Sequence, residues 1–274
     1  MLLLYGPPGT GKTTLCRALA HKLSIRSVDI FPSGGYLLEI KSHSLFSKWF
    51  SESGKLISRL FGRIKEMVED EPDALFCVLI DEVESLASSR ISSGGGVEPS
   101  DAVRAVNSLL TSLDSIRQFR NVLILSTSNI TECVDGAFVD RVDWMVKIDL
   151  PCLEARYEIL RSCVEELARV GVVRVNDDHE HDDDNGDEKA GEQMNGTHLL
   201  GYEQASMDAG NDDNQASKML LECAKLAEGL SGRSLRKLPF QSHAFHVRSA
   251  DGVSILEFLS ALKAGVERKV KGDI

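Results

Sequence analysis

Residues 2–13 read LLLYGPPGTGKT, which combines an apolar run, a glycine-rich loop and the start of a helical pattern. The apolar run Leu2–Tyr5 is typical of a short buried strand, and a helical stretch, Lys12–Leu23, follows the glycines. Between them, Gly6–Thr13 fits the pattern GxxxxGK[ST]. In this pattern glycines let backbone N–H groups turn inward around phosphate oxygens, and the following helix directs its positive end at them. The stretch therefore predicts a phosphate-binding loop between a strand and a helix.

The loop also predicts the contacts of a bound nucleotide. Lys12 would neutralise the β and γ phosphates of ATP, and Thr13 would give its hydroxyl to Mg²⁺. The alternative is a glycine-rich turn without a ligand, which the strand before and the helix after the loop disfavour. We expect ATP to lie against the continuous set Gly6, Pro7, Pro8, Gly9, Thr10, Gly11, Lys12, Thr13 and Thr14.

A second motif, Phe76–Glu82, is a continuous apolar run that ends in two carboxylates. Such a run is typical of a strand buried on both faces of a parallel sheet. At its carboxyl end, Asp81 can hold Mg²⁺ through water and Glu82 can polarise the attacking water. Acidic residues commonly end strands, so this interpretation depends on the phosphate loop that comes before it.

Asn129 follows a further apolar run, Val122–Ser126. A neutral polar side chain at this place could hold the attacking water against the γ phosphate. The alternative is a simple turn residue, the usual role of Asn after a strand. Together with the two motifs above, Asn129 is predicted to belong to the site.

Apolar runs alternate with helical patterns as far as residue 150, which predicts a parallel α/β sheet flanked by helices. After Pro151 only helical patterns follow. We therefore expect a large domain over residues 1–150 and a small all-helical lid domain over residues 151–274. The expected lid helices are Leu153–Val170, Ala216–Glu228, Ser234–Val247 and Ile255–Val270.

The net charge of −11 is concentrated in one segment. Residues 177–215 hold thirteen acidic residues and one lysine, so this segment carries −12 and the rest of the chain +1. High like charge with few apolar residues predicts a disordered insertion at about residues 174–216. His179 and His181 within it could hold a metal, but composition favours a solvated loop.

Composition excludes several classes of function. The six cysteines lie far apart without a CxxC pair, so neither a zinc site nor a disulfide framework is expected, and they read as reduced thiols. The apolar runs are too short for a membrane span or a signal peptide. No basic stripe predicts direct nucleic-acid binding.

These motifs together resemble the AAA+ ATPases, and within them the pachytene checkpoint protein two family. The resemblance covers nearly the entire chain. It rests on Gly6–Thr13, on Ser42–Lys55, on Ile80–Leu86, on the sequence Ser126-Thr127-Ser128-Asn129, on Asp135-x-Ala137-x-x-x-Arg141 and on Gly229–Arg233.

The resemblance implies a homo-hexameric ring that uses ATP to pull open HORMA-domain proteins, presented by an adaptor. It implies roles in meiotic recombination and synapsis checkpoint control and in spindle-checkpoint silencing, in the nucleus and the cytoplasm. Asn129 falls on the first sensor, Arg141 on an arginine finger that reaches a neighbouring subunit, and Arg233 on a second sensor in the lid. Trp49 matches a pore-loop aromatic residue that grips the substrate. Phe50 beside it would either grip the substrate as well or support the pore loop.

The chain departs from the family pattern in two places. Asp140 precedes a single Arg141, where many members carry two arginines. The family also has an amino-terminal domain and a leading part of the ATPase domain, so we expect this chain to be a fragment or a truncated gene model. A catalytically impaired fragment or an ATP-dependent assembly scaffold is the alternative function, and a DNA-directed loader is disfavoured by the lack of basic composition.

Overall fold

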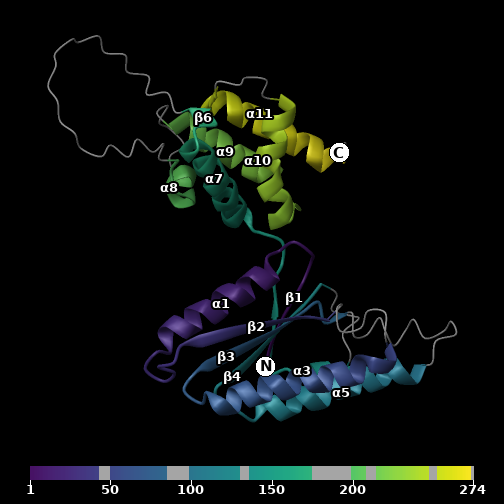
Figure 1. The fold of residues 1–274 in the computed structure, drawn as a ribbon. Helices are drawn as coiled ribbons and strands as arrows, with labels where there is room; N and C mark the ends of the chain where they lie inside the picture. The colour runs from purple at the N-terminus through teal and green to yellow at the C-terminus, as the bar shows by residue number, and fades with distance from the viewer. Residues whose placement is uncertain are drawn as a thin grey trace, which may run out of the picture. The chain divides into compact units, whose positions relative to one another are not determined.

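The computed structural model describes residues 1–42, 50–84, 99–129, 136–174, 199–207, 214–246 and 252–272, with the backbone alone at 50–53 and 99–103. The chain divides into two compact units, Met1–Asp149 and Leu150–Ile274 (Figure 1).

The first unit is built on a parallel five-stranded sheet in the order β2-β3-β4-β1-β5. The interior strand β3 pairs with β2 on one side and β4 on the other, and six of its seven residues are buried. This confirms the predicted parallel α/β sheet. The strands are β1 (Leu2–Tyr5), β2 (Gly35–Lys41), β3 (Leu75–Asp81), β4 (Val122–Ser128) and β5 (Trp144–Lys147).

Helices cover both faces of this sheet (Figure 1). Helix α1 (Lys12–Arg26) lies on one face, and helices α3 (Phe50–Asp70) and α5 (Pro99–Arg117) lie on the other. The short helix α6 (Gly136–Val139) comes before β5.

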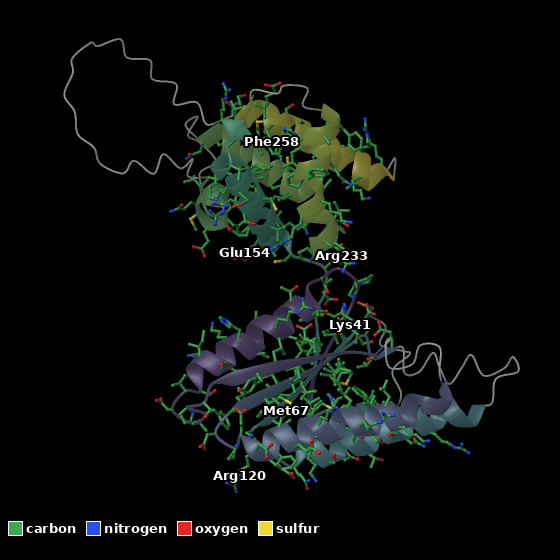
Figure 2. The ribbon with its side chains drawn as sticks, in the orientation of Figure 1. Lys41, Met67, Arg120, Glu154, Arg233 and Phe258 are labelled. Atoms are coloured by element: carbon green, nitrogen blue, oxygen red, sulfur yellow. The ribbon has the colours of Figure 1, made fainter. Side chains whose placement is uncertain are left out.

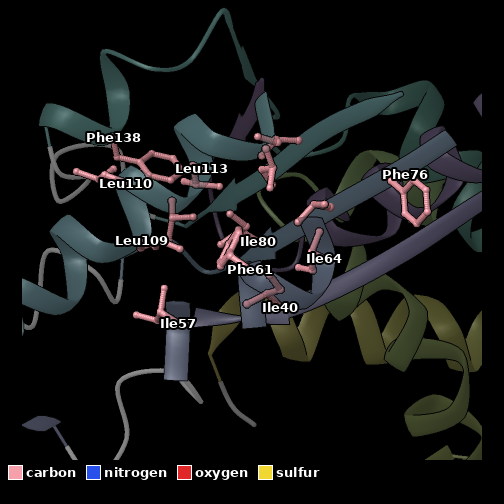
Figure 3. Packing of buried hydrophobic residues seen from close by; sticks show 14 of the residues in the cluster. Ile40, Ile57, Phe61, Ile64, Phe76, Ile80, Leu109, Leu110, Leu113 and Phe138 are labelled. Carbon is pink, nitrogen blue, oxygen red and sulfur yellow. The ribbon is translucent and has the colours of Figure 1, made fainter. Parts of the chain in front are cut away.

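The alternation of side chains along β3 explains why both faces need cover. Phe76 and Ile80 point into the cluster that α3 and α5 complete (Figure 3). Cys77 and Leu79 point to the opposite face and pack with Cys16 of α1. A strand buried on both faces has no polar side, which is why its sequence is a continuous apolar run.

Because the sheet is parallel, the carboxyl ends of its strands meet at one edge. The loops that follow β1, β3 and β4 contain the phosphate-loop motif, Glu82 and Asn129. Ligands of open parallel sheets bind outside this carboxyl edge. The fold therefore gathers the residues of all three predicted motifs at one place.

The second unit packs its helices around the buried ring of Phe258, whereas Arg233 is exposed on the unit's surface (Figure 2). Its last helix is well specified by sequence. The Ser254 hydroxyl accepts the Glu257 amide at 3.3 Å, and Gly272 ends the helix in the left-handed conformation at φ 80°. The helices are α7 (Leu153–Arg169), α8 (Tyr202–Met207), α9 (Gln215–Leu226), α10 (Gly232–His246) and α11 (Ile255–Lys271).

The second unit is helical, as predicted, and it also contains two short strands that the helical patterns did not predict. Strand β6 (Val173–Arg174) pairs in parallel with β7 (Val253–Ser254). Val173 and Val253 are both 2% exposed and join the apolar core of this unit. Two-residue strands are too short to show a period in the sequence, so pattern analysis cannot find them.

The expectation of disorder over residues 174–216 is corrected for residues 199–207. This stretch folds back onto the second unit, where Leu199 is 2% exposed and Ala205 is 5% exposed. Charge averaged over the whole acidic segment hid a short apolar cluster inside it. His179 and His181 lie outside the described residues.

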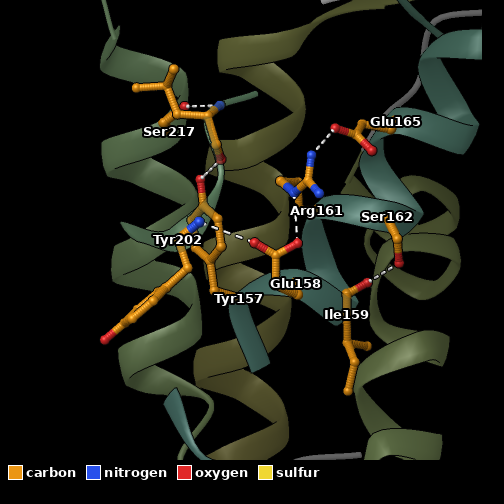
Figure 4. A network of polar contacts seen from close by, with 9 residues as sticks. Tyr157, Glu158, Ile159, Arg161, Ser162, Glu165, Tyr202 and Ser217 are labelled. Carbon is orange, nitrogen blue, oxygen red and sulfur yellow. Dashed lines mark hydrogen bonds and ion pairs between the residues drawn. The ribbon is translucent and has the colours of Figure 1, made fainter. Parts of the chain in front are cut away.

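A polar network fastens this stretch (Figure 4). The Tyr157 hydroxyl donates to the Leu200 carbonyl at 2.7 Å, and the Leu200 amide donates to Ser217 Oγ at 3.1 Å. The Tyr202 amide donates to Glu158 Oε1 at 3.0 Å. Paired backbone groups offset the cost of burying the segment.

Among the described helices, none is long and apolar enough to cross a membrane.

Candidate functional site

The predicted phosphate loop has the backbone conformation that its glycines allow. Gly6, Gly9 and Gly11 have φ values of 145°, 78° and 92°, which side-chain-bearing residues rarely adopt. At Gly6 a Cβ atom would also lie 2.1 Å from the Ile148 carbonyl oxygen. Only glycine therefore fits at Gly6, because of the backbone conformation and because Ile148, just after the neighbouring strand β5, approaches so closely.

Helix α1 begins directly after this loop. All residues of α1 are described, and its first turn contains no acidic residue that would compete with a bound anion for the positive helix end. Lys12 is only 5% exposed, and its Nζ donates to the carbonyls of Gly6 at 2.9 Å and Pro7 at 2.8 Å. The ammonium therefore lies along the loop itself, where a phosphate bound in the loop would be within its reach.

The two residues predicted for Mg²⁺ come into direct contact. Thr13 Oγ1, from the first turn of α1, donates to Asp81 Oδ1, from the end of β3, at 2.8 Å. A hydroxyl and a carboxylate are the hard oxygen donors that Mg²⁺ takes in nucleotide sites. The residues present thus fit a Mg²⁺ ion bound together with phosphates.

Glu82, the predicted general base, occupies an unusual backbone position. Its φ of 60° makes it the single residue other than glycine with positive φ in the described part of the chain. Strained conformations of this kind concentrate at functional sites. The strain falls on the residue to which the sequence assigns the water-activating carboxylate.

Asn129 lies immediately beyond β4, next to the start of the loop. The amide of Gly6 donates to the Ser128 carbonyl at 3.2 Å, which ties the loop to the end of β4. The Asn129 side-chain amide donates to Glu84 Oε1 at 2.8 Å. Asn129 is therefore oriented at the same edge as Glu82, and its contact with a water remains a prediction.

Arg141 is not brought to the loop of its own chain. The Asp143 amide donates to the Met1 carbonyl at 3.0 Å, so Arg141 lies near the start of β1. The phosphate loop follows the other end of β1. Four residues of strand separate the two ends by about 13 Å. The Arg141 guanidinium instead contacts Asp114, with Nη2 to Oδ2 at 2.9 Å, and the Ala137 carbonyl at 2.7 Å.

The remaining predicted residues cannot be placed at this site. Arg233 is exposed in the first turn of α10, in the second unit. Trp49 lies outside the described residues, and Phe50 is described only as the first backbone position of α3.

Three residues that were not predicted for the site hold it together. Ser42 Oγ donates to the Asp81 carbonyl at 2.8 Å, Glu84 accepts from Asn129, and Thr127 contacts both Asp81 and Glu82. Glu84 and Thr127 each lie two positions in the sequence from a predicted residue, Glu82 and Asn129 respectively. That spacing is the signal that could have found them.

The nearby thiol of Cys16 plays no role as a nucleophile. Burial raises its pKa to about 12, and the negative charge of Asp81 adds to this effect. The thiol therefore stays protonated at neutral pH.

Comparison with known families agrees with this geometry. Residues 2–150 match the family described as "ATPase family associated with various cellular activities (AAA)". Residues 152–270 match "TRIP13-like, AAA+ ATPase lid C-terminal domain". The chain belongs to the TRIP13-like branch of the AAA ATPases.

Individual relatives in this branch are similar over nearly the whole chain. The chain is 49% identical to the Arabidopsis thaliana pachytene checkpoint protein 2 homolog over 251 residues, which cover 89% of this chain and 50% of that protein. It is 46% identical to the Homo sapiens homolog over 272 residues, covering 98% of this chain and 57% of that one. The chain thus spans about half the length of the curated relatives it matches.

Solved structures show the same fold. The structure of C. elegans PCH-2 has a TM-score of 0.78 and 40% identity, covering 98% of this TRIP13-like chain and 62% of the other. A structure of an E. coli HORMA:CdnC:Trip13 complex has a TM-score of 0.65 at 18% identity, with 96% and 73% covered. The second likeness concerns the fold alone.

Proposed function

We propose that the chain binds Mg-ATP between the phosphate loop and Asp81 and hydrolyses the ATP with Glu82 as general base. The observation that carries the proposal is the contact of Thr13 with Asp81 at the carboxyl edge, 2.8 Å long and formed by residues 68 positions apart. A loop without a ligand has no need of a hydroxyl and a carboxylate held against each other beside its helix.

Each side chain then has one task. The amides of the loop and the Lys12 ammonium bind the β and γ phosphates, and Thr13 and Asp81 would hold Mg²⁺, which when bound offsets charge on the phosphoryl oxygens. Glu82 accepts the proton of the attacking water, and Asn129 orients that water. Because Arg141 lies at the opposite edge of the sheet, it can serve this reaction only in a neighbouring subunit.

We further propose that the ATPase is a homo-hexamer that remodels HORMA-domain proteins delivered by an adaptor. Support comes from its similarity to pachytene checkpoint protein 2 homologs, and from a protein of the same fold in a solved complex with a HORMA protein. In this proposal the pore loop with Trp49 and Phe50 grips the substrate. Remodelling of HORMA-domain proteins would serve meiotic and spindle checkpoints in the nucleus and the cytoplasm, without direct binding of the ATPase to nucleic acid or membrane.

Hydrolysis is tested by steady-state ATP turnover. Glu82→Gln should retain ATP affinity and lose turnover, because the amide keeps the size of the side chain but cannot accept a proton. Glu66→Gln, the same change at an exposed position on α3, is the matched control and should behave as wild type. Turnover by Glu82→Gln at the wild-type rate would remove Glu82 from the mechanism.

The remodelling step needs its own assay in the full-length protein. Conversion of a closed HORMA-domain substrate to its open form is followed together with ATP turnover. Trp49→Ala should keep turnover within a few fold and stop conversion, since no phosphate contact depends on it. Normal conversion by Trp49→Ala would contradict a gripping role, and stimulation of turnover by double-stranded DNA would favour a DNA-directed loader instead.

A further inference from the structure

Thr127 occupies a central position between the two carboxylates of the site. It lies on β4 and is 2% exposed. Its hydroxyl accepts a hydrogen bond from the Glu82 amide at 3.2 Å and donates one to Asp81 Oδ1. One buried hydroxyl thus links the residue predicted for Mg²⁺ to the residue predicted for water activation.

The main chain of Thr127 also bonds to the turn at Glu82. Its carbonyl accepts the amide of Val83 at 3.0 Å. The amides of Glu82 and of Val83, which flank the Glu82 Cα atom, are therefore both bonded to Thr127. The first bond is to its side chain and the second to its main chain. These bonds fix the turn in which Glu82 adopts its φ of 60°, a conformation that a residue with a side chain keeps only when its surroundings over-determine it.

The Asp81 carboxylate is fixed in the same way. Its Oδ1 accepts hydrogen bonds from two hydroxyls, Thr13 on α1 and Thr127 on β4. Two donors that approach one oxygen from different elements restrict rotation of the carboxylate more than one donor does. Thr127 therefore acts on the direction of both carboxylates at once.

We propose that Thr127 is a positioning residue for ATP hydrolysis, which sets the turn at Glu82 and the orientation of Asp81. This proposal rests on the proposed function. In it Thr127 touches neither nucleotide nor water, and acts through its two neighbours. Hydrolysis depends on the placement of the general base to within a fraction of an ångström, so a small relaxation of this turn should slow the chemical step more than it weakens binding.

Thr127→Val is the direct test, because valine keeps the shape of threonine and removes the hydroxyl. The turnover number should fall about tenfold to a hundredfold, the effect of losing one hydrogen bond to a charged group, while KM for ATP changes less than about threefold. Thr127→Ser, which restores a hydroxyl, should recover most of the rate. Recovery of rate by serine separates positioning from a general packing role.

Amide hydrogen exchange, measured residue by residue on the same chain, gives a readout that needs no activity. In Thr127→Val the Glu82 amide should exchange on the order of tenfold faster, because its acceptor is gone. The Val83 amide is the internal control and should be unchanged, since its acceptor is the Thr127 main chain. Should Thr127→Val not fold, Thr127→Ala removes the same hydroxyl and carries the same prediction.

A second control removes a different buried hydroxyl from the same strand. Ser126 is fully buried, and its Oγ donates to the Leu2 carbonyl at 3.0 Å. Ser126→Ala should leave both turnover and Glu82 exchange as in wild type. Equal exchange at Glu82 in wild type and Thr127→Val, or no recovery with serine, would overturn the proposal. If the wild type itself hydrolyses no ATP, the proposed function fails, and exchange at Glu82 still decides the role of Thr127.

Discussion

Replacing Arg141 with alanine separates two roles that the structure allows for this side chain. Its guanidinium contacts Asp114 and the Ala137 carbonyl within the chain, and the side chains of Arg141 and Asp114 are 30% and 49% exposed. Ion pairs this open to solvent contribute about 0.2–1 kcal/mol. We therefore expect Arg141→Ala to lower the free energy of unfolding by about 1 kcal/mol.

A finger acting in a neighbouring subunit contributes far more to the reaction. Loss of such an arginine slows hydrolysis by on the order of a thousandfold, which corresponds to about 4 kcal/mol. The catalytic effect of Arg141→Ala should thus exceed its effect on stability several-fold. Urea denaturation measures the effect on stability, and steady-state ATP turnover of the assembled protein measures the effect on catalysis.

Asp114→Asn is the matched control, because it weakens the same ion pair and leaves the guanidinium in place. It should cost similar stability and keep turnover within a few fold. Mixing Arg141→Ala with Lys12→Ala subunits should restore part of the activity, since each provides what the other lacks. A role for Arg141 in a neighbouring subunit is refuted if Asp114→Asn slows hydrolysis as much as Arg141→Ala, or if mixing restores no activity.

Three further predictions concern stability. A Cβ at Gly265 would lie 2.2 Å from Ser242 Oγ, so Gly265→Ala should lower the free energy of unfolding in urea by about 1–2 kcal/mol, and Ser242→Ala should restore it; an unchanged value would contradict this packing. Deleting residues 177–196, which removes none of the described residues, should shift Tm in a thermal melt by less than about 2 °C. Deleting residues 177–215 also removes buried side chains and should lower Tm by about 4–10 °C. Equal shifts would show that residues 199–207 add no stability. Burial raises the pKa of three thiols above their ordinary value of 9.0, namely Cys16 to about 12, Cys77 to about 11 and Cys223 to about 12. The stabilisation from these buried thiols is complete below pH 9 and is lost as the pH rises from 9 through the folded-state pKa values. Between pH 8 and pH 10 the free energy of unfolding in urea should therefore fall by about 1.4 kcal/mol in total for each thiol, and a flat profile would contradict their burial.

The sequence predicts most of the first unit because its signals are local. The glycine pattern of the loop requires a strand before it and a helix after it, and the apolar run of β3 requires cover on both faces. Once the sheet is parallel, the carboxyl ends of its strands share an edge. The contact between Thr13 and Asp81 follows from these local facts.

Other contacts depend on registers between distant elements and have no local signature. The bond from Asn129 to Glu84 joins residues 45 positions apart, and the pair of Arg141 with Asp114 joins residues 27 apart. The strand pair β6–β7 and the short helix α8 are each too small for a period to emerge. The return of residues 199–207 to the core is hidden because composition was averaged over a strongly acidic segment.

Thr13 and Asp81 are proposed to build a magnesium-dependent nucleotide site beside the loop. The most direct measurement is the Kd of ATP for the wild type and for Asp81→Asn, by calorimetry, with Mg²⁺ and with EDTA. We expect Mg²⁺ to tighten binding by the wild type about tenfold or more and to have little effect on Asp81→Asn, because the variant lacks the carboxylate charge that holds the ion. Equal affinities with and without Mg²⁺ in the wild type, or the same magnesium dependence in Asp81→Asn, would contradict the assignment of this site.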